Sequence, residues 1–201
     1  MGTIEKFYRT YFDNWQKDHY LQFNAKEYGL TEDNYWEVIL EPSLITNESF
    51  GKIERQLEDS LPSFFKEFYS SYYTLEKDFD TGVIIAGNRR KDNLALLSEY
   101  FFDHSLSDNI RKLGLLPFGY YNDEWYVCLD MNNNKENPPI MLFEMSNYQA
   151  GADAISHRPW FSDFNSMLMC LSDQIKTESP DNFDRIDPGN NFLTAYDYWP
   201  R

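Results

Sequence analysis

The sequence is poor in cysteine, with only Cys128 and Cys170 among 201 residues. The two lie 42 positions apart and allow at most one disulfide. Residues 1–20 have no basic start followed by an apolar run, so they do not resemble a secretory signal. No apolar run approaches the roughly 20 residues that span a bilayer. We therefore expect a soluble, intracellular protein of the reducing cytoplasm, with two free, buried thiols and no membrane contact.

Histidine and catalytic motifs are equally scarce. His19, His104 and His157 are far apart and near no cysteine pair, so the spacing of a zinc site is missing. There is no Gly-x-Ser-x-Gly, His-Glu-x-x-His or Gly-Lys-Ser/Thr motif. Asp123 and Glu124 are adjacent carboxylates, but they follow a turn residue and project to opposite faces of a hairpin. We expect no metal, no cofactor and no catalytic centre, and hence a protein that is not an enzyme.

Basic residues are outnumbered by acidic ones, 18 against 33, which gives a formal net charge of −15. This charge disfavours nucleic acids and anionic lipids as partners and favours a basic protein. Residues 120–201 hold 13 acidic and 5 basic side chains, a net charge of −8. An acidic surface that serves only solubility is the alternative. The basic cluster 89–91 precedes a predicted helix and is either a phosphate site or a solvated helix start.

Aromatic residues, in contrast, are abundant, with 16 Phe, 15 Tyr and 5 Trp. A large, ring-rich core in a single main domain is therefore expected. The first apolar stripe has helical spacing and predicts an amphipathic helix; it comprises Ile4, Phe7, Tyr8, Tyr11, Phe12 and Trp15. We interpret residues 1–45 as an N-terminal helical extension that packs on the core.

In the middle of the chain, the spacing of apolar residues changes several times between a helical and a strand-like pattern. A helix is predicted from Thr46 or Asn47, and Leu61-Pro62 forms a sharp corner to a second helix in which Pro62 takes the first position. A strand at 83–86 and a helix at 92–104 follow. Alternating residues at 125–130 and the run 140–143 predict an antiparallel, central hairpin. A closing helix through Phe161 to Ile175, starting near Ser162 or Asp163, precedes an irregular tail at 177–201.

This order of elements resembles the SMI1/KNR4 family of the SUKH superfamily. The resemblance covers about residues 46–176 and is carried by Ile53-Glu54 with Leu57, Leu61-Pro62 with Phe64, Phe65 and Phe68, Leu116-Pro117-Phe118-Gly119, Trp125 to Asp130, Pro139-Ile140, and Trp160-Phe161 with Phe164. Ser70 to Tyr73 stands where family members often have a Gly-rich turn. Residues 1–45 and the tail lie outside the match.

The resemblance implies an α+β fold, with a mixed or antiparallel sheet flanked by helices. It also implies a bacterial immunity protein that neutralises a polymorphic or contact-dependent toxin by tight binding. The acidic charge favours a basic, nucleic-acid-acting toxin as the protein partner. The alternative is an intracellular regulator or scaffold for cell-wall or signalling functions, which eukaryotic relatives resemble.

Acidic and aromatic residues occur together in 120–201, which we interpret as the partner-binding region. The candidate residues are the acids Asp123, Glu124, Asp130, Glu136, Asp181, Asp184 and Asp187 and the rings Tyr121, Tyr126 and Trp199. Tyr121 and Tyr126 also fit positions in the core of the predicted sheet, so both interpretations of these two rings stay open at this point.

Overall fold

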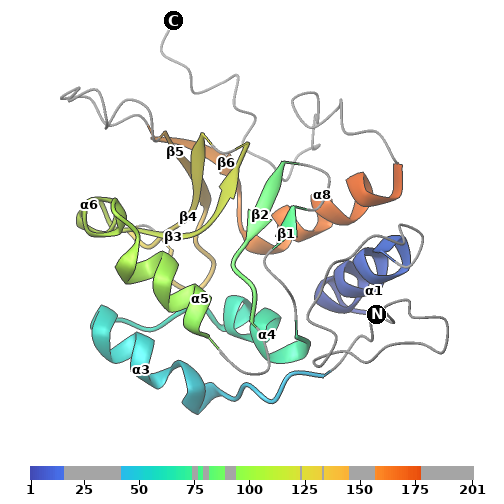
Figure 1. Cartoon of the computed structure of the whole chain (residues 1–201), viewed down its shortest axis with the longest axis horizontal. Coiled ribbons are helices and arrows are strands. Elements are labelled where there is room, and N and C mark those ends of the chain that lie inside the picture. The colour runs from blue at the N-terminus through green and yellow to red at the C-terminus, as the bar shows by residue number, and fades with distance from the viewer. Residues whose placement is uncertain are drawn as a thin grey trace, which may run out of the picture.

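The computed structural model describes residues 1–15, 42–73, 77–78, 82–88, 94–122, 124–132, 134–144 and 157–177. In this part of the chain, six strands form one antiparallel sheet in the order β1-β2-β3-β4-β5-β6, and helices flank the sheet (Figure 1). The predicted α+β fold is confirmed, and between the two predicted kinds of sheet the structure has the antiparallel one.

Runs of helices and runs of strands alternate along the described chain. The helices are α1 (Thr3–Trp15), α3 (Asn47–Leu57), α4 (Ser63–Ser71), α5 (Ala95–Ser98), the π-helical turn η1 (Glu99–Asp103), α6 (Ser107–Lys112) and α8 (Phe164–Thr177). The strands are β1 (Lys77–Asp78), β2 (Val83–Ile85), β3 (Leu115–Tyr121), β4 (Trp125–Asp130), β5 (Ile140–Glu144) and β6 (His157–Phe161).

The sheet is buried on both faces at its centre. One face belongs to the main core, through residues such as Phe118, Val127 and Leu142. The opposite face presents a smaller apolar cluster that is covered by Leu106 and Ile110, and its strand residues are Leu115, Tyr126, Cys128, Met141 and Phe143. The predicted hairpin is confirmed as β4 and β5, both of which have a neighbouring strand on each side.

Helix α1 is part of the main core. Phe7 and Tyr8 are fully buried, and the Tyr8 hydroxyl donates a hydrogen bond to the Phe68 carbonyl oxygen at 3.1 Å. Burial raises the pKa of Tyr8 well above its ordinary value, so the phenol keeps its proton. Helices α1 and α8 lie side by side although they come from opposite ends of the described chain (Figure 1). The predicted amphipathic helix is thus confirmed.

A carboxylate holds the corner between α3 and α4. The Glu54 Oε1 atom accepts hydrogen bonds from the Leu61 backbone N–H at 3.0 Å and from Lys66 Nζ at 2.9 Å. Helix α3 ends in a left-handed residue, Glu58, with φ 56°, which turns the chain toward Leu61. Of the two N-caps predicted for α3 the structure has Thr46, and Pro62 is the N-cap of α4 instead of its first helical residue.

Gly119 allows β2 and β3 to pair at a bulge. The register of β3 against β4 shifts between Pro117 and Gly119. A Cβ atom at position 119 would lie 2.2 Å from the Ile84 carbonyl oxygen, a distance that no side chain tolerates. The Leu-Pro-Phe-Gly segment, residues 116–119, lies within β3, and its glycine is required by the close approach of two backbones.

The helix predicted at 92–104 changes geometry in the structure. One α-helical turn, α5, continues into η1, where the His104 N–H bonds to the Glu99 carbonyl oxygen five residues earlier. The wider turn lets two consecutive rings, Tyr100 and Phe101, be buried in the main core. The closing helix begins as predicted near Asp163, whose carboxylate accepts the Ser166 N–H at 2.7 Å. The start of the 92–104 segment and the tail from 178 onward lie outside the described residues.

We expect Glu54→Ala to lower the free energy of unfolding by about 1–2 kcal/mol, because Leu61 N–H and Lys66 would both lose their acceptor. Urea denaturation of the variant and of the wild-type protein measures this difference. Glu136→Ala, which removes an exposed carboxylate in the loop between β4 and β5, is the matched control and should change stability by less than about 0.5 kcal/mol. An equally small effect of Glu54→Ala would contradict this account of the corner.

Both cysteines are free and buried, as predicted. Burial raises the pKa of Cys170 to about 12, and it raises the pKa of Cys128 well above its ordinary value. At pH 8, alkylation by iodoacetamide followed by mass spectrometry should therefore be at least about 100-fold slower for the native protein than for the urea-unfolded chain.

The raised pKa values of the two thiols also make the stability of the fold depend on pH. The folded protein holds thiol protons that the unfolded chain releases near pH 8.5, so stability should decrease as the pH rises from about 8.5 toward 12. Rapid alkylation of native protein at pH 8 would show that the thiols reach solvent without unfolding.

Candidate partner-binding surface

A cluster of rings and one arginine lies where the β3–β4 turn meets β6. The Tyr121 ring packs against Trp160 in a tilted arrangement with centroids 4.9 Å apart, and the Arg158 guanidinium lies 4.5 Å from the centroid of Trp125. We call Tyr121, Trp125, Arg158 and Trp160 the turn-end cluster. Trp125, Arg158 and Trp160 are half-buried, so each presents part of its surface to solvent.

The sheet pairing brings these side chains together. Tyr121 pairs with Trp125 across the β3–β4 turn, and Arg158 pairs with Leu142 on the neighbouring strand β5. The turn itself is tied to β2, because the Asn122 N–H donates to the Gly82 carbonyl oxygen at 2.8 Å. Rings and an arginine that are held by a sheet lose little side-chain freedom when they bind a partner.

The structure places the predicted binding residues in different surroundings. Glu124 is exposed in the β3–β4 turn, beside the turn-end cluster, and Glu136 is exposed in the β4–β5 loop. Tyr121 is only 6% exposed, and its ring supports Trp160. Tyr126 is 3% exposed, and its ring lies on the opposite face of the sheet, 4.8 Å from the ring of Tyr120. For these two rings, the structure shows the core position.

Asp130 is also buried, at 7% exposure. Its carboxylate accepts hydrogen bonds from the backbone N–H and the side-chain amide of Asn132, at 3.0 and 2.9 Å. This arrangement shapes the start of the β4–β5 loop. The candidates Asp123, Asp181, Asp184, Asp187 and Trp199 lie outside the described residues.

The described candidates do not form one patch. Strand β4 runs from Trp125 to Asp130, so Glu124 and Glu136 lie at opposite ends of the sheet, about 20 Å apart by strand geometry. At the Glu136 end, Lys135 bonds to Asp59 at 2.5 Å and keeps the pKa of that carboxyl below its ordinary value. The structure therefore brings together Glu124 and the turn-end cluster, and it separates them from Asp130 and Glu136.

Sequence reasoning missed Arg158 and did not select Trp125 or Trp160 as binding residues. Arg158 lies in a strand that the sequence pattern did not reveal. Trp160 was recognised only as part of the family pattern, and nothing local to it shows that its ring contacts Tyr121. These contacts are long-range, since β6 follows the β3–β4 turn by more than 30 residues.

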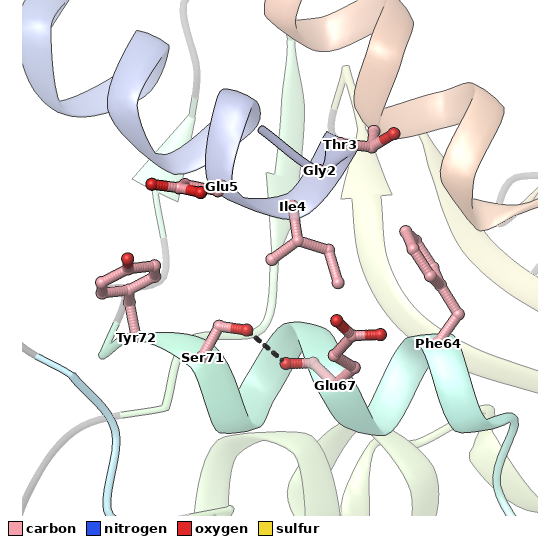
Figure 2. Close-up of a pocket in the computed structure, with 8 residues that line it drawn as sticks. All are labelled: Gly2, Thr3, Ile4, Glu5, Phe64, Glu67, Ser71 and Tyr72. Carbon is pink, nitrogen blue, oxygen red and sulfur yellow. Dashed lines mark hydrogen bonds between the residues drawn. The ribbon is translucent and has the colours of Figure 1, made fainter.

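A pocket of about 370 Å³ opens between the start of α1 and one face of α4 (Figure 2). Its walls combine two carboxylates with two rings and small polar groups, and the lining residues are Gly2, Thr3, Ile4, Glu5, Phe64, Glu67, Ser71 and Tyr72. No pattern in the sequence predicts this pocket, because residues 1–45 are expected only to pack on the core.

The His104 side chain lies among aromatic rings. Tyr120 Oη and His104 Nδ1 share a hydrogen bond of 2.6 Å, and rings of Tyr100 and Tyr126 surround the histidine. Among the residues that the structure describes, no three His, Cys, Asp or Glu side chains gather to hold a metal ion. None of the described helices is long and apolar enough to span a bilayer.

Comparison with known proteins agrees with this arrangement of elements. A search of curated proteins finds no match to the sequence. The family model described as SMI1 / KNR4 family (SUKH-1) matches residues 44–170, from the segment before α3 into α8. This span is more than half of the chain and includes the Glu54 corner and the Gly119 bulge. The chain therefore belongs to the SMI1/KNR4 family of the SUKH superfamily.

Proposed function

We propose that this chain is a non-catalytic binding module, an immunity protein that neutralises a cognate toxin by direct contact. Membership of the SMI1/KNR4 family is the observation that carries the proposal. The net charge of −15 supports a basic partner, such as a toxin domain that itself binds nucleic acid through Lys and Arg.

The turn-end cluster is the part of the described surface best suited to bind such a partner. Trp and Arg are the side chains that most often contribute strongly to protein interfaces, and here they are half-buried and packed against neighbouring rings. Trp160 and Trp125 would supply apolar contact, and Tyr121 would act from behind by supporting Trp160. Tyr121 therefore stays among the proposed binding residues as a support for Trp160, although its own ring is buried.

Acidic residues would act mainly on the rate of encounter. Glu124 is next to the cluster, and Asp123 and the tail acids Asp181, Asp184 and Asp187 belong to the same proposed surface by sequence. Opposite charges steer two proteins together and raise the association rate, and added salt weakens this effect. Glu136 at the far end of the sheet would contribute to the long-range field only.

The test measures binding kinetics between this protein and the toxin encoded beside its gene, at two salt concentrations. We expect Glu124→Lys to lower the association rate several-fold and to weaken its salt dependence. Trp160→Ala should mainly raise the dissociation rate, with a loss of about 2 kcal/mol in binding free energy. Trp160→Phe, which keeps a ring against Tyr121, should retain more of the affinity and guards against a folding defect.

Two control variants locate the interface. Glu48→Lys reverses an exposed charge on α3, and Leu44→Ala truncates an apolar side chain that is 71% exposed, so both should leave the kinetics nearly unchanged. If Glu48→Lys abolishes association while Glu124→Lys has no effect, the interface lies on the helical side. Lack of binding to any neighbouring toxin, together with specific binding of a host cell-wall or signalling protein, would favour the regulator.

A further inference from the structure

The pocket between α1 and α4 is built by residues that are regularly spaced along one helix. Phe64, Glu67 and Ser71 are three and four positions apart on α4, so they line one face of it. The first turn of α1 lies over this face, with Ile4 buried at 5% exposure between the two helices. In Figure 2, the Glu67 side chain extends from α4 toward α1, and Glu5 lies above Tyr72.

The charges at this pocket are not balanced. Glu5 forms an ion pair with Arg9 at 2.9 Å. The lysines on the same two helices pair elsewhere, since Lys6 binds Asp173 at 3.3 Å and Lys66 binds Glu54 at 2.9 Å. Within the described part of the chain, no cation pairs with the Glu67 carboxylate. The pocket therefore has an excess negative charge.

Its aromatic walls are held rigidly. The Tyr72 ring packs on Tyr8 with centroids 5.0 Å apart, and the Phe64 ring lies edge-on to Phe164 at 6.2 Å. A cation next to an aromatic face is attracted by the ring quadrupole, and the attraction increases when water is excluded. The volume of about 370 Å³ is near the lower end of ligand pockets, a size that suits one long side chain.

We infer that this pocket receives an arginine or lysine side chain of a basic protein partner, with Glu67 as its counter-ion and Tyr72 and Phe64 as its walls. The inference rests on the proposed function for the nature of the partner. It adds a second contact, formed by helices, to the turn-end cluster on the sheet. It also assigns a role to the start of α1, which lies outside the residues matched by the family.

One feature of the pocket favours an anionic ligand over a cation. Backbone N–H groups at the start of a helix attract anions, and Gly2 and Thr3 place the start of α1 at the pocket. Glu5 in the first turn of α1 already supplies a negative charge there. Arg9 offsets the charge of Glu5, but the Glu67 carboxylate carries a full negative charge against the partial positive charge of one helix terminus, so an anion should bind more weakly than a cation.

Chemical-shift titration of the full-length protein tests this inference without any partner. The probes are Nα-acetyl-arginine methylamide, the norleucine analogue, which lacks the charge, and the glutamate analogue, which reverses it. We expect the arginine probe to shift the amide signals of residues 3–5 and 64–72 in a saturable way at millimolar concentration. Glu67→Gln should weaken its affinity about tenfold, and Glu136→Gln, the matched control, should leave it unchanged.

Three results would overturn the inference: no saturable shift with the arginine probe, equal binding of the norleucine probe, or no effect of Glu67→Gln. Tighter binding of the glutamate probe would overturn it as well, because the helix terminus would then dominate. These outcomes are independent of the toxin experiment. Arginine binding without toxin binding would refute the immunity function but support the pocket as a cation site. Toxin binding that Glu67→Gln leaves unchanged would show that the pocket is not part of the toxin interface.

Discussion

The packing of one phenylalanine against four others is the contact on which the arrangement of this protein depends. Phe164 is the first residue of α8, and its ring centroid lies between 5.1 and 6.2 Å from those of Phe64, Phe65, Phe68 and Phe118. These rings come from α4 and from the sheet. Because large rings bury much apolar surface and prefer edge-to-face contacts, this cluster positions α4 and α8 against the strands.

Both candidate sites derive their shape from that cluster. Phe68 also contacts Phe7 and Tyr8, so α1 is placed by the same rings and the pocket forms where its first turn passes over α4. At the other site, Trp160 packs on Phe161 with centroids 4.5 Å apart, and Phe161 is buried in the same core. The core thus fixes the few side chains that would decide how slowly a partner dissociates. The association rate, in contrast, would depend on the electrostatic field of all the acidic residues together.

The sequence alone predicted those features that depend on neighbouring residues. Helical spacing identified α1, α3, α4 and α8, alternation identified the β4–β5 hairpin, and the ordered motifs identified the family. The short strand β1 and the strand β6, with no strong pattern of their own, escaped notice because they form by pairing with distant strands. The π-helical turn η1 was not predicted either. Its wider turn allows Tyr100 and Phe101 to pack in the core, and this requirement comes only from the tertiary structure.

The site residues also differ in whether the local sequence was enough to predict their surroundings. Local chemistry was enough to show that Glu124 stands in a turn, that both cysteines are buried and that the chain is acidic. Whether Tyr121 and Tyr126 face solvent depended on which elements cover each face of the sheet. Tyr121 belongs to the main core, and Tyr126 lies on the opposite face, which Leu106 and Ile110 cover. The sequence by itself thus determined the family, the order of most elements and the charge; tertiary packing decided which rings are exposed and where a pocket forms, because both depend on contacts between segments far apart in the chain.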